Sequence, residues 1–436
     1  MVQEKLGEGD RTFYIFPMRP WNILLPSPSG PMRGYFTLAV ALSGPVYAVI
    51  QFGEVIARKS LGASTLSITI LTMLMPLANF TAIWWSRILE GRDQRKTILF
   101  VGLFGHLALM TGIYLTHLPH LLLIFLAYYL SYAVIITAQN RILQQHVSSS
   151  DHGSLFGMAN AMRMATAALA SYLAGLWMDI HPDGFRHVFL FTGAFGIVSS
   201  VLFASIPTRH QVEHHAWIPN GRNLMAPLVD TGRLLKRRGD FFRFEVGFMI
   251  YGVAFMMMLP VTPIFLVDDL QLDYATIGLA RGAIYQLVTI LAIFLFGRMY
   301  DRMTPHALAA RVFSLLALHP LLLIGSQLVP GMMIPAVFAS YILFGVAMGG
   351  VSILWSVSSV RFAGEEDAGV YQAVHVAATA IRGSVAPLFG YLVMTLLGRL
   401  PALGIASGIW LTSGIVMAYL DKRDGSLLRP ASQNSI

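Results

Sequence analysis

The sequence predicts an all-α membrane protein of twelve transmembrane helices, arranged as two pseudo-symmetric six-helix bundles. Three observations support this fold class. Of the 436 residues, 56% are hydrophobic and only 12% are charged, and the mean hydropathy is +0.64. A soluble domain of this length needs more charge to cover its surface. The other two observations are a series of long apolar segments and an internal repeat of that series.

Apolar segments long enough to cross about 30 Å of hydrocarbon recur along the chain when it is read in windows of about 19 residues. The first six occupy residues 34–57, 65–85, 97–116, 121–143, 155–178 and 187–206. The second six occupy residues 244–267, 274–297, 307–328, 333–357, 368–396 and 401–420. The first 33 residues lack an apolar core, so we expect no cleavable signal peptide.

The positions of Lys and Arg orient these segments, because cytoplasmic loops carry the excess of both residues. Most of the 30 basic residues lie in the tails and in the loops on one side. The loops on the other side hold Arg58, Lys59, Arg186 and Arg399. We therefore expect an integral membrane protein with both termini in the cytoplasm. This asymmetry explains the net charge of +8, so nucleic acid is not expected as a partner.

The longest connection divides the chain into two halves. We expect a tail at 1–33, a bundle at 34–206, a cytoplasmic linker at 207–243, a second bundle at 244–420 and a tail at 421–436. The halves repeat each other in sequence. Ser64 and Asp273 are expected to be matching helix N-caps, with Leu61 and Ile68 corresponding to Leu270 and Ile277 at the same offset.

The loop after the second helix of each half carries a small residue, an acid four positions later and then basic residues. In the second half Gly297, Asp301 and Arg302 form this pattern well, and in the first half Glu90 and Arg95 form it loosely. With two six-helix halves, this pattern resembles the major facilitator superfamily, whose members surround a central cavity with two bundles. The resemblance implies that these five residues help to close the cytoplasmic side in one state. The alternative is ordinary positive-inside loop charge.

The resemblance implies a secondary active transporter that moves a small solute by alternating access. An Arg-Gly pair, Arg382 and Gly383, is similar to a poorly described bacterial branch of the family and indicates no substrate. The signatures of proton-driven drug antiporters in the fourth and fifth helices are absent. Drug or lipid efflux is therefore less favoured and is kept as the alternative. A non-transporting receptor or scaffold is the alternative from another class, and we expect no enzyme, cofactor or metal site.

Two arginines, Arg163 and Arg382, occupy related positions in the fifth and eleventh segments. At 1.5 Å per residue both lie roughly 15 to 20 Å from the cytoplasmic end, near mid-depth. A buried cation without a carboxylate partner favours an anion, so we expect an organic anion as the substrate. The alternatives are that each Arg braces the bundle or pairs with Glu54. Arg281 is interpreted as an outer-vestibule residue or a ligand.

Two polar stripes complete the expected site. At 100° per residue, Tyr371, His375 and Arg382 share one face of the eleventh segment, and Tyr47, Gln51 and Glu54 share one face of the first. His375 is the first candidate for proton coupling and Glu54 is the second. The alternative for both stripes is hydrogen bonding between helices.

Three further residues, Gln139, Tyr251 and Trp355, are expected to line the pocket or to pack in the core. His106 and His319 are interpreted as structural. The expected partners are a small-molecule substrate, the lipid bilayer and protons as coupling ions, and we expect a monomer.

Overall fold

The computed structural model describes residues 30–81, 84–85, 88–89, 94–146, 149–206, 226–364, 366 and 368–424. Within these ranges the chain is helical and contains no β-strand. The predicted gating residue Glu90 and the first part of the predicted linker lie outside them.

The first half contains six spans, two of which are built from more than one helix. Its helices are α1 (Gly30–Leu42), α2 (Gly44–Lys59), α3 (Thr65–Phe80), α5 (Gln94–Met110), the 3-10 turn η1 (Thr111–Tyr114), α6 (Leu118–His146), α7 (Ser149–Ile180) and α8 (Gly184–Ser205). α1 and α2 form one span that is interrupted at Ser43. Pro45 explains the interruption, because a proline has no N–H to donate to the preceding turn.

The second half begins with an amphipathic helix, α10 (Ala226–Arg237), which lies inside the predicted linker. Its other helices are α11 (Gly239–Ile264), the π-helical turn η2 (Phe265–Asp269), α12 (Tyr274–Ile277), the π-helical turn η3 (Gly278–Ile284), α13 (Tyr285–Tyr300), α14 (Pro305–Leu316), α15 (Leu318–Leu328), α16 (Met333–Ala363), α17 (Ala368–Leu397) and α18 (Arg399–Asp424). The runs α11–η2, α12–η3–α13 and α14–α15 each form one span.

These helices agree with the twelve predicted spans. Ten spans in the described chain are long and apolar enough to cross a membrane, and α3 is a shorter apolar helix. α7 supplies the remaining span. The two predicted N-caps are also confirmed, because Ser64 Oγ accepts from the Ser67 amide and Asp273 Oδ1 accepts from the Thr276 amide.

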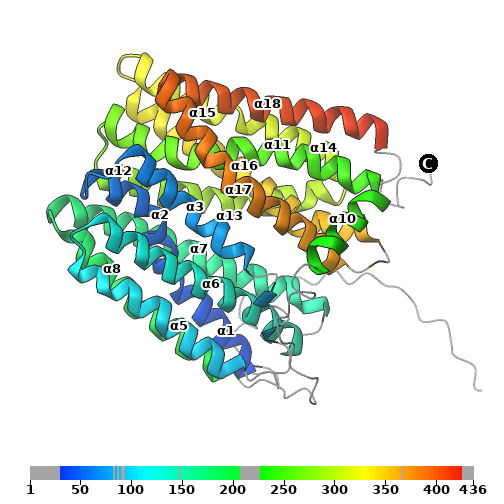
Figure 1. The fold of residues 1–436 in the computed structure, drawn as a ribbon, viewed down its shortest axis with the longest axis horizontal. Helices are drawn as coiled ribbons and strands as arrows, with labels where there is room; N and C mark the ends of the chain where they lie inside the picture. The colour runs from blue at the N-terminus through cyan, green and yellow to red at the C-terminus, as the bar shows by residue number, and fades with distance from the viewer. Residues whose placement is uncertain are drawn as a thin grey trace, which may run out of the picture.

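The two halves lie side by side in Figure 1, the first in blue to green and the second in green to red. They meet at the end where α2 and α12 lie, and their helices diverge toward the end where α10 lies and α18 finishes (Figure 1). We call these the far end and the linker end. The divergence means that the halves are held together mainly toward the far end.

Glycines allow helices of opposite halves to approach closely. A Cβ added to Gly278 of η3 would lie 2.5 Å from the carbonyl oxygen of Ser171 on α7. A Cβ added to Gly383 of α17 would lie 2.3 Å from Cβ of Pro76 on α3. Neither distance leaves room for a side chain. Gly383 of the Arg-Gly pair therefore packs against the other half.

Candidate functional site

Ion pairs join the halves at the far end. Arg58 at the end of α2 donates to Asp268 of η2 through Nε at 2.7 Å and through Nη2 at 2.5 Å. Arg399 at the start of α18 donates to Asp269 through Nε and Nη2, and its Nη1 lies 3.5 Å from Asp268 Oδ2. Two adjacent carboxylates at the end of a span are thus neutralised by arginines from two directions, and one of these arginines belongs to the other half.

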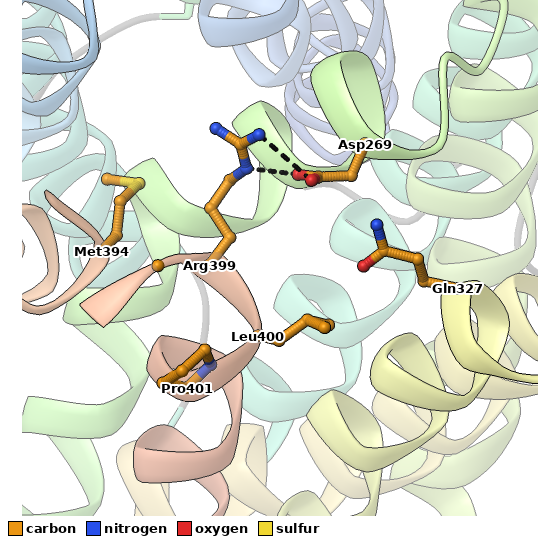
Figure 2. A pocket seen from close by; sticks show the side chains of 7 residues that line it. Asp269, Gln327, Met394, Arg399, Leu400 and Pro401 are labelled. Carbon is orange, nitrogen blue, oxygen red and sulfur yellow. Dashed lines mark hydrogen bonds and ion pairs between the residues drawn. The ribbon is translucent and has the colours of Figure 1, made fainter.

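A cavity of about 370 Å³ opens beside these ion pairs. It is lined by Asp269, Gln327, Met394, Gly398, Arg399, Leu400 and Pro401. Figure 2 shows Arg399 and Asp269 bonded to each other at its edge. None of the predicted binding residues contributes to this lining, so the cavity belongs to the far-end surface.

Backbone groups strengthen the far-end contact. The carboxylate of Asp179, at the end of α7, accepts from the amides of Tyr274 and Ala275 at 2.8 and 2.7 Å. An acid of the first half therefore caps the first turn of α12 in the second half. Lys59 Nζ donates to the Leu272 carbonyl at 2.8 Å, and the Tyr274 hydroxyl bonds to Ser60 Oγ at 2.6 Å.

Deeper in the bundle, Glu54 of α2 pairs with Arg281 of η3 across the two halves. Arg281 Nη2 lies 3.2 Å from Glu54 Oε2, and the two side chains are 18% and 11% exposed. The sequence left Arg281 open as an outer-vestibule residue, a snorkelling residue or a ligand, and considered Glu54 as a partner for the mid-depth arginines. Both residues lie roughly two turns from the far end of their spans, so matching their depths would have indicated the pair.

Arg163 of α7 lies half-buried beneath the predicted stripe of α2. Its guanidinium carbon is 5.4 Å from the centre of the Tyr47 ring, and its Nε is buried without a hydrogen-bond partner among the described residues. The Tyr132 hydroxyl of α6 lies within hydrogen-bonding range of it, and Tyr128 of α6 lies within electrostatic range. Within the described part of the chain, no carboxylate oxygen lies within 4.0 Å of this guanidinium.

Arg382 of α17 lies in a different environment, inside the second half. It is 4% exposed, and its Nη1 donates to the Phe248 carbonyl of α11 at 2.9 Å. The rings of Phe248, Tyr251 and Trp355 surround it, with centres 5.5, 5.9 and 6.0 Å from its guanidinium carbon. Gly252 makes room, since a Cβ there would lie 2.3 Å from Arg382 Nε.

His375, two turns before Arg382 on the same face of α17, pairs with a carboxylate. Its Nδ1 lies 2.7 Å from Glu245 Oε1 of α11, with the side chains 2% and 5% exposed. The ring of Trp355 lies 4.3 Å away, in an edge-to-face arrangement. Glu245 begins the seventh predicted span, and spacing along the chain did not indicate that it meets His375.

Tyr371 completes this stripe at the linker end. Its hydroxyl accepts from Arg238 Nη1 at 2.6 Å and donates to Glu366 at 3.1 Å. Arg238 also donates to Asp240, and this hydrogen bonding raises the pKa of Arg238 above its usual value, so the guanidinium stays charged. The predicted stripe therefore faces α11 throughout its length. Tyr371, His375, Arg382, Tyr251 and Trp355 form one cluster within the second half.

The predicted residues of the first half form a second group. Tyr47 and Gln51 lie half-buried on α2, and Gln51 Oε1 is buried without a partner among the described residues. Gln139 lies half-buried on α6. Of this group, Glu54 bonds to the second half, through Arg281.

The predicted gating residues lie at the linker end. Asp301 caps α13, and its amide donates to the Gly297 carbonyl at 3.2 Å. The Arg302 amide donates to the Met299 carbonyl at 3.1 Å. Arg95 Nε donates to the Ala204 carbonyl at 2.7 Å, at the end of α8 in its own half. Glu90, the remaining predicted gating residue, lies outside the described residues.

The structural interpretation of two histidines is confirmed. His106 Nδ1 lies 2.7 Å from the Gly102 carbonyl, and His319 Nδ1 lies 2.6 Å from Ser340 Oγ. Each bond stays within one half. Among the residues that the structure describes, no group of three or more His, Asp or Glu residues is placed to hold a metal ion.

Comparison with known proteins agrees with this architecture. The sequence profile of the Major Facilitator Superfamily matches residues 36–387 and 244–434. No curated protein matches the sequence. A mutant of the nucleoside transporter NupG is similar with a TM-score of 0.71 at 12% identity, over 89% of this chain and 99% of that chain.

Two other solved structures are similar over about the same share of the chain. A POT family transporter in complex with 5-aminolevulinic acid has a TM-score of 0.73 at 11% identity, over 90% of this chain and 96% of that chain. The xylose transporter XylE from E. coli has a TM-score of 0.63 at 13% identity, over 89% and 95%. These TM-scores show a shared fold, and the family profile covers most of the chain. The chain belongs to the Major Facilitator Superfamily.

Proposed function

We propose that this protein is a secondary active transporter that moves a small organic anion across the membrane by alternating access. The observation that carries the proposal is the environment of Arg163. This cation lies between α7 and the polar stripe of α2, and no described carboxylate lies within 4.0 Å of it. Arg281, a buried cation that contacts the opposite half, already has Glu54 as its partner.

A carboxylate or phosphate of the substrate would supply the missing charge. A guanidinium holds such a group through two parallel hydrogen bonds, and the free Nε of Arg163 is one of the donors that this geometry needs. Arg163, Tyr47 and Gln51 are half-buried, and a solute that binds them would replace the packing that now buries Arg163 Nε and Gln51 Oε1. Gln139 is proposed as a further polar wall.

The second cation, Arg382, is proposed to position the second half rather than to bind the anion. Its bond to the Phe248 carbonyl and its three aromatic neighbours support this bracing role, which the sequence left open. Tyr251 and Trp355 then act on the substrate indirectly, by holding α11, α16 and α17 together.

His375 is proposed as the proton-coupling residue, together with Glu245. A buried imidazole hydrogen-bonded to a carboxylate changes the charge of the second half when it binds a proton. Its surroundings include the rings of Phe248 and Trp355, and Arg382 lies two turns later on the same face of α17. Glu54 is the second candidate, because protonation would release Arg281 and loosen the contact between the halves.

Alternating access requires that the far-end contacts break. In the outward-open state, the bonds of Asp268 to Arg58 and of Asp179 to α12 would separate, and contacts at the linker end would form. Asp301 and Glu90 with Gly297, Arg302 and Arg95 are proposed to make those contacts. We also propose a monomer in a bacterial inner membrane with both termini and the linker in the cytoplasm, which reporter fusions at residues 207–243 would check.

The decisive test is binding and transport by the purified chain. A thermal-shift screen would compare carboxylates, phosphates, nucleosides, sugars, amino acids and cationic drugs, since ligands of the folded state raise its melting temperature. Hits would then be tested for uptake into liposomes. We expect anions to dominate the hits. Binding restricted to cationic or apolar compounds would instead establish the efflux alternative, and binding without uptake would establish a receptor.

A further inference from the structure

Polar atoms without partners gather around the ion pair of Glu54 and Arg281. Arg281 uses Nη2 for Glu54, but its Nη1 is buried without a hydrogen-bond partner among the described residues. Gln51 Oε1, one turn before Glu54 on α2, is in the same state. So is the hydroxyl of Tyr341 on α16, which lies within electrostatic range of both charges.

These atoms define the chemistry of a ligand. A buried polar atom is costly unless a partner satisfies it, so three such atoms around one ion pair indicate a group that completes them. Arg281 Nη1 donates, Gln51 Oε1 accepts, and the Tyr341 hydroxyl does both. Hydroxyl groups match this mixed set. A second charge matches it poorly, because the ion pair is neutral as a whole.

The polar atoms around the Glu54–Arg281 pair and the contact of Arg163 lie along the same face of α2. Tyr47, which lies against Arg163, belongs to the same face of α2 as Gln51 and Glu54. From Tyr47 to Glu54 the helix rises about 10 Å. A solute of that length would span the distance from Arg163, at its acidic end, to the ion pair at its other end.

We propose that Gln51, Arg281 and Tyr341 bind hydroxyl groups of the substrate while Arg163 binds its acidic group. This inference rests on the anion transport proposed above and narrows the substrate to a polyhydroxylated organic anion. Sugar acids and sugar phosphates have this chemistry.

Four probes separate the two parts of the proposal. Gluconate and glucose 6-phosphate carry both hydroxyls and a charge, hexanoate carries a charge without hydroxyls, and sorbitol carries hydroxyls without a charge. We expect gluconate or glucose 6-phosphate to raise the melting temperature of the purified full-length protein at lower concentration than hexanoate or sorbitol. A preference for one of the two identifies a carboxylate or a phosphate as the acidic group.

Two conservative variants test the named contacts. Tyr341→Phe and Gln51→Met should each weaken binding of the hydroxylated anion about tenfold, the effect of one hydrogen bond that leaves its partner unsatisfied. Their affinity for hexanoate should stay unchanged. Tyr419→Phe, at a residue that is 62% exposed on α18, is the matched control.

The outcomes distinguish this inference from the proposed function. Equal affinities for hexanoate and the hydroxylated anions, with both variants like wild type, would refute the hydroxyl contacts and leave anion binding intact. Sorbitol binding as tightly as the anions, with Arg163→Ala unchanged, would refute anion transport itself. Absence of binding by both hydroxylated anions would overturn the substrate class.

Discussion

Arg163 and Arg382 occupy matching places in the two halves, yet their surroundings differ. Arg163 is half-buried against one ring, that of Tyr47, and its Nε has no partner among the described residues. Arg382 Nε also has no partner among these residues, but Arg382 is buried among three rings and its Nη1 donates to the Phe248 carbonyl. The second half therefore uses its cation within its own packing, and we propose that the first half leaves its cation available to a ligand.

This difference teaches that repeated sequence does not imply repeated function. The duplication placed a guanidinium at equivalent depth in both halves, and the neighbouring helices then decided its role. In the second half, Gly252 lets the side chain lie flat against α11, where the aromatic rings and the carbonyl hold it. The predictions below test this asymmetry.

The largest expected effect is on ligand binding by Arg163→Ala. We expect affinity for the anionic ligand to fall by about tenfold to a hundredfold, because the variant loses a charge-assisted hydrogen bond. The melting temperature should stay close to wild type, since no described carboxylate loses its partner. Arg163→Lys should recover part of the affinity, because an ammonium lacks the bidentate fork. Lys236→Ala, at an exposed residue of α10, is the control. Wild-type affinity in Arg163→Ala would remove the asymmetry.

The matching variant in the second half should show the reverse order. Arg382→Ala is expected to lower the free energy of unfolding by about 2 kcal/mol, through the cavity and the lost cation–π contacts. Folded protein should keep most of its affinity. Thermal melts and binding isotherms on the same preparation check this. A variant with a normal melting temperature and no binding would make Arg382 a ligand of the anion.

A smaller effect is expected on the pH dependence of transport. If His375 carries the coupled proton, the rate of transport should depend on pH. His375→Gln should flatten this profile while retaining ligand binding, and Glu245→Gln should alter it. Uptake into liposomes at a series of pH values measures the profile. An unchanged profile in His375→Gln, with a flat one in Glu54→Gln, would move coupling to the contact between the halves.

The smallest effect is expected at the far end. Asp268→Asn weakens the pair with Arg58, which is partly exposed and contributes about 1 kcal/mol, so the outward-open population should rise about fivefold. The chain contains no cysteine, so Ser171→Cys provides a single probe buried at the contact of α7 with η3. Labelling of this probe should increase in Asp268→Asn. His117→Cys, at an exposed residue, should label equally in both backgrounds, and equal labelling of Ser171→Cys would show that the far-end pair does not hold the closed state.

Local features of the sequence were sufficient to predict the spans. Hydropathy over a window is a property of consecutive residues, and the N-caps Ser64 and Asp273 bond to amides three residues later. The family also followed from local patterns, such as the loop around Gly297 and Asp301, together with their repetition. These predictions needed no knowledge of which helices touch.

The partners of the charged residues were decided by the tertiary structure alone. Glu54 and Arg281 are far apart in the chain and meet only because α2 packs against η3 at the same depth. Hydropathy and spacing identified Arg163 and Arg382 as equivalent cations, but they contain no information on which neighbouring helix supplies a carbonyl, a ring or an empty space. Sequence determined the depth of each charge in the membrane, and the packing of the helices decided whether that charge is satisfied by the protein or left for a ligand, because pairing depends on distances between side chains that the chain order does not specify.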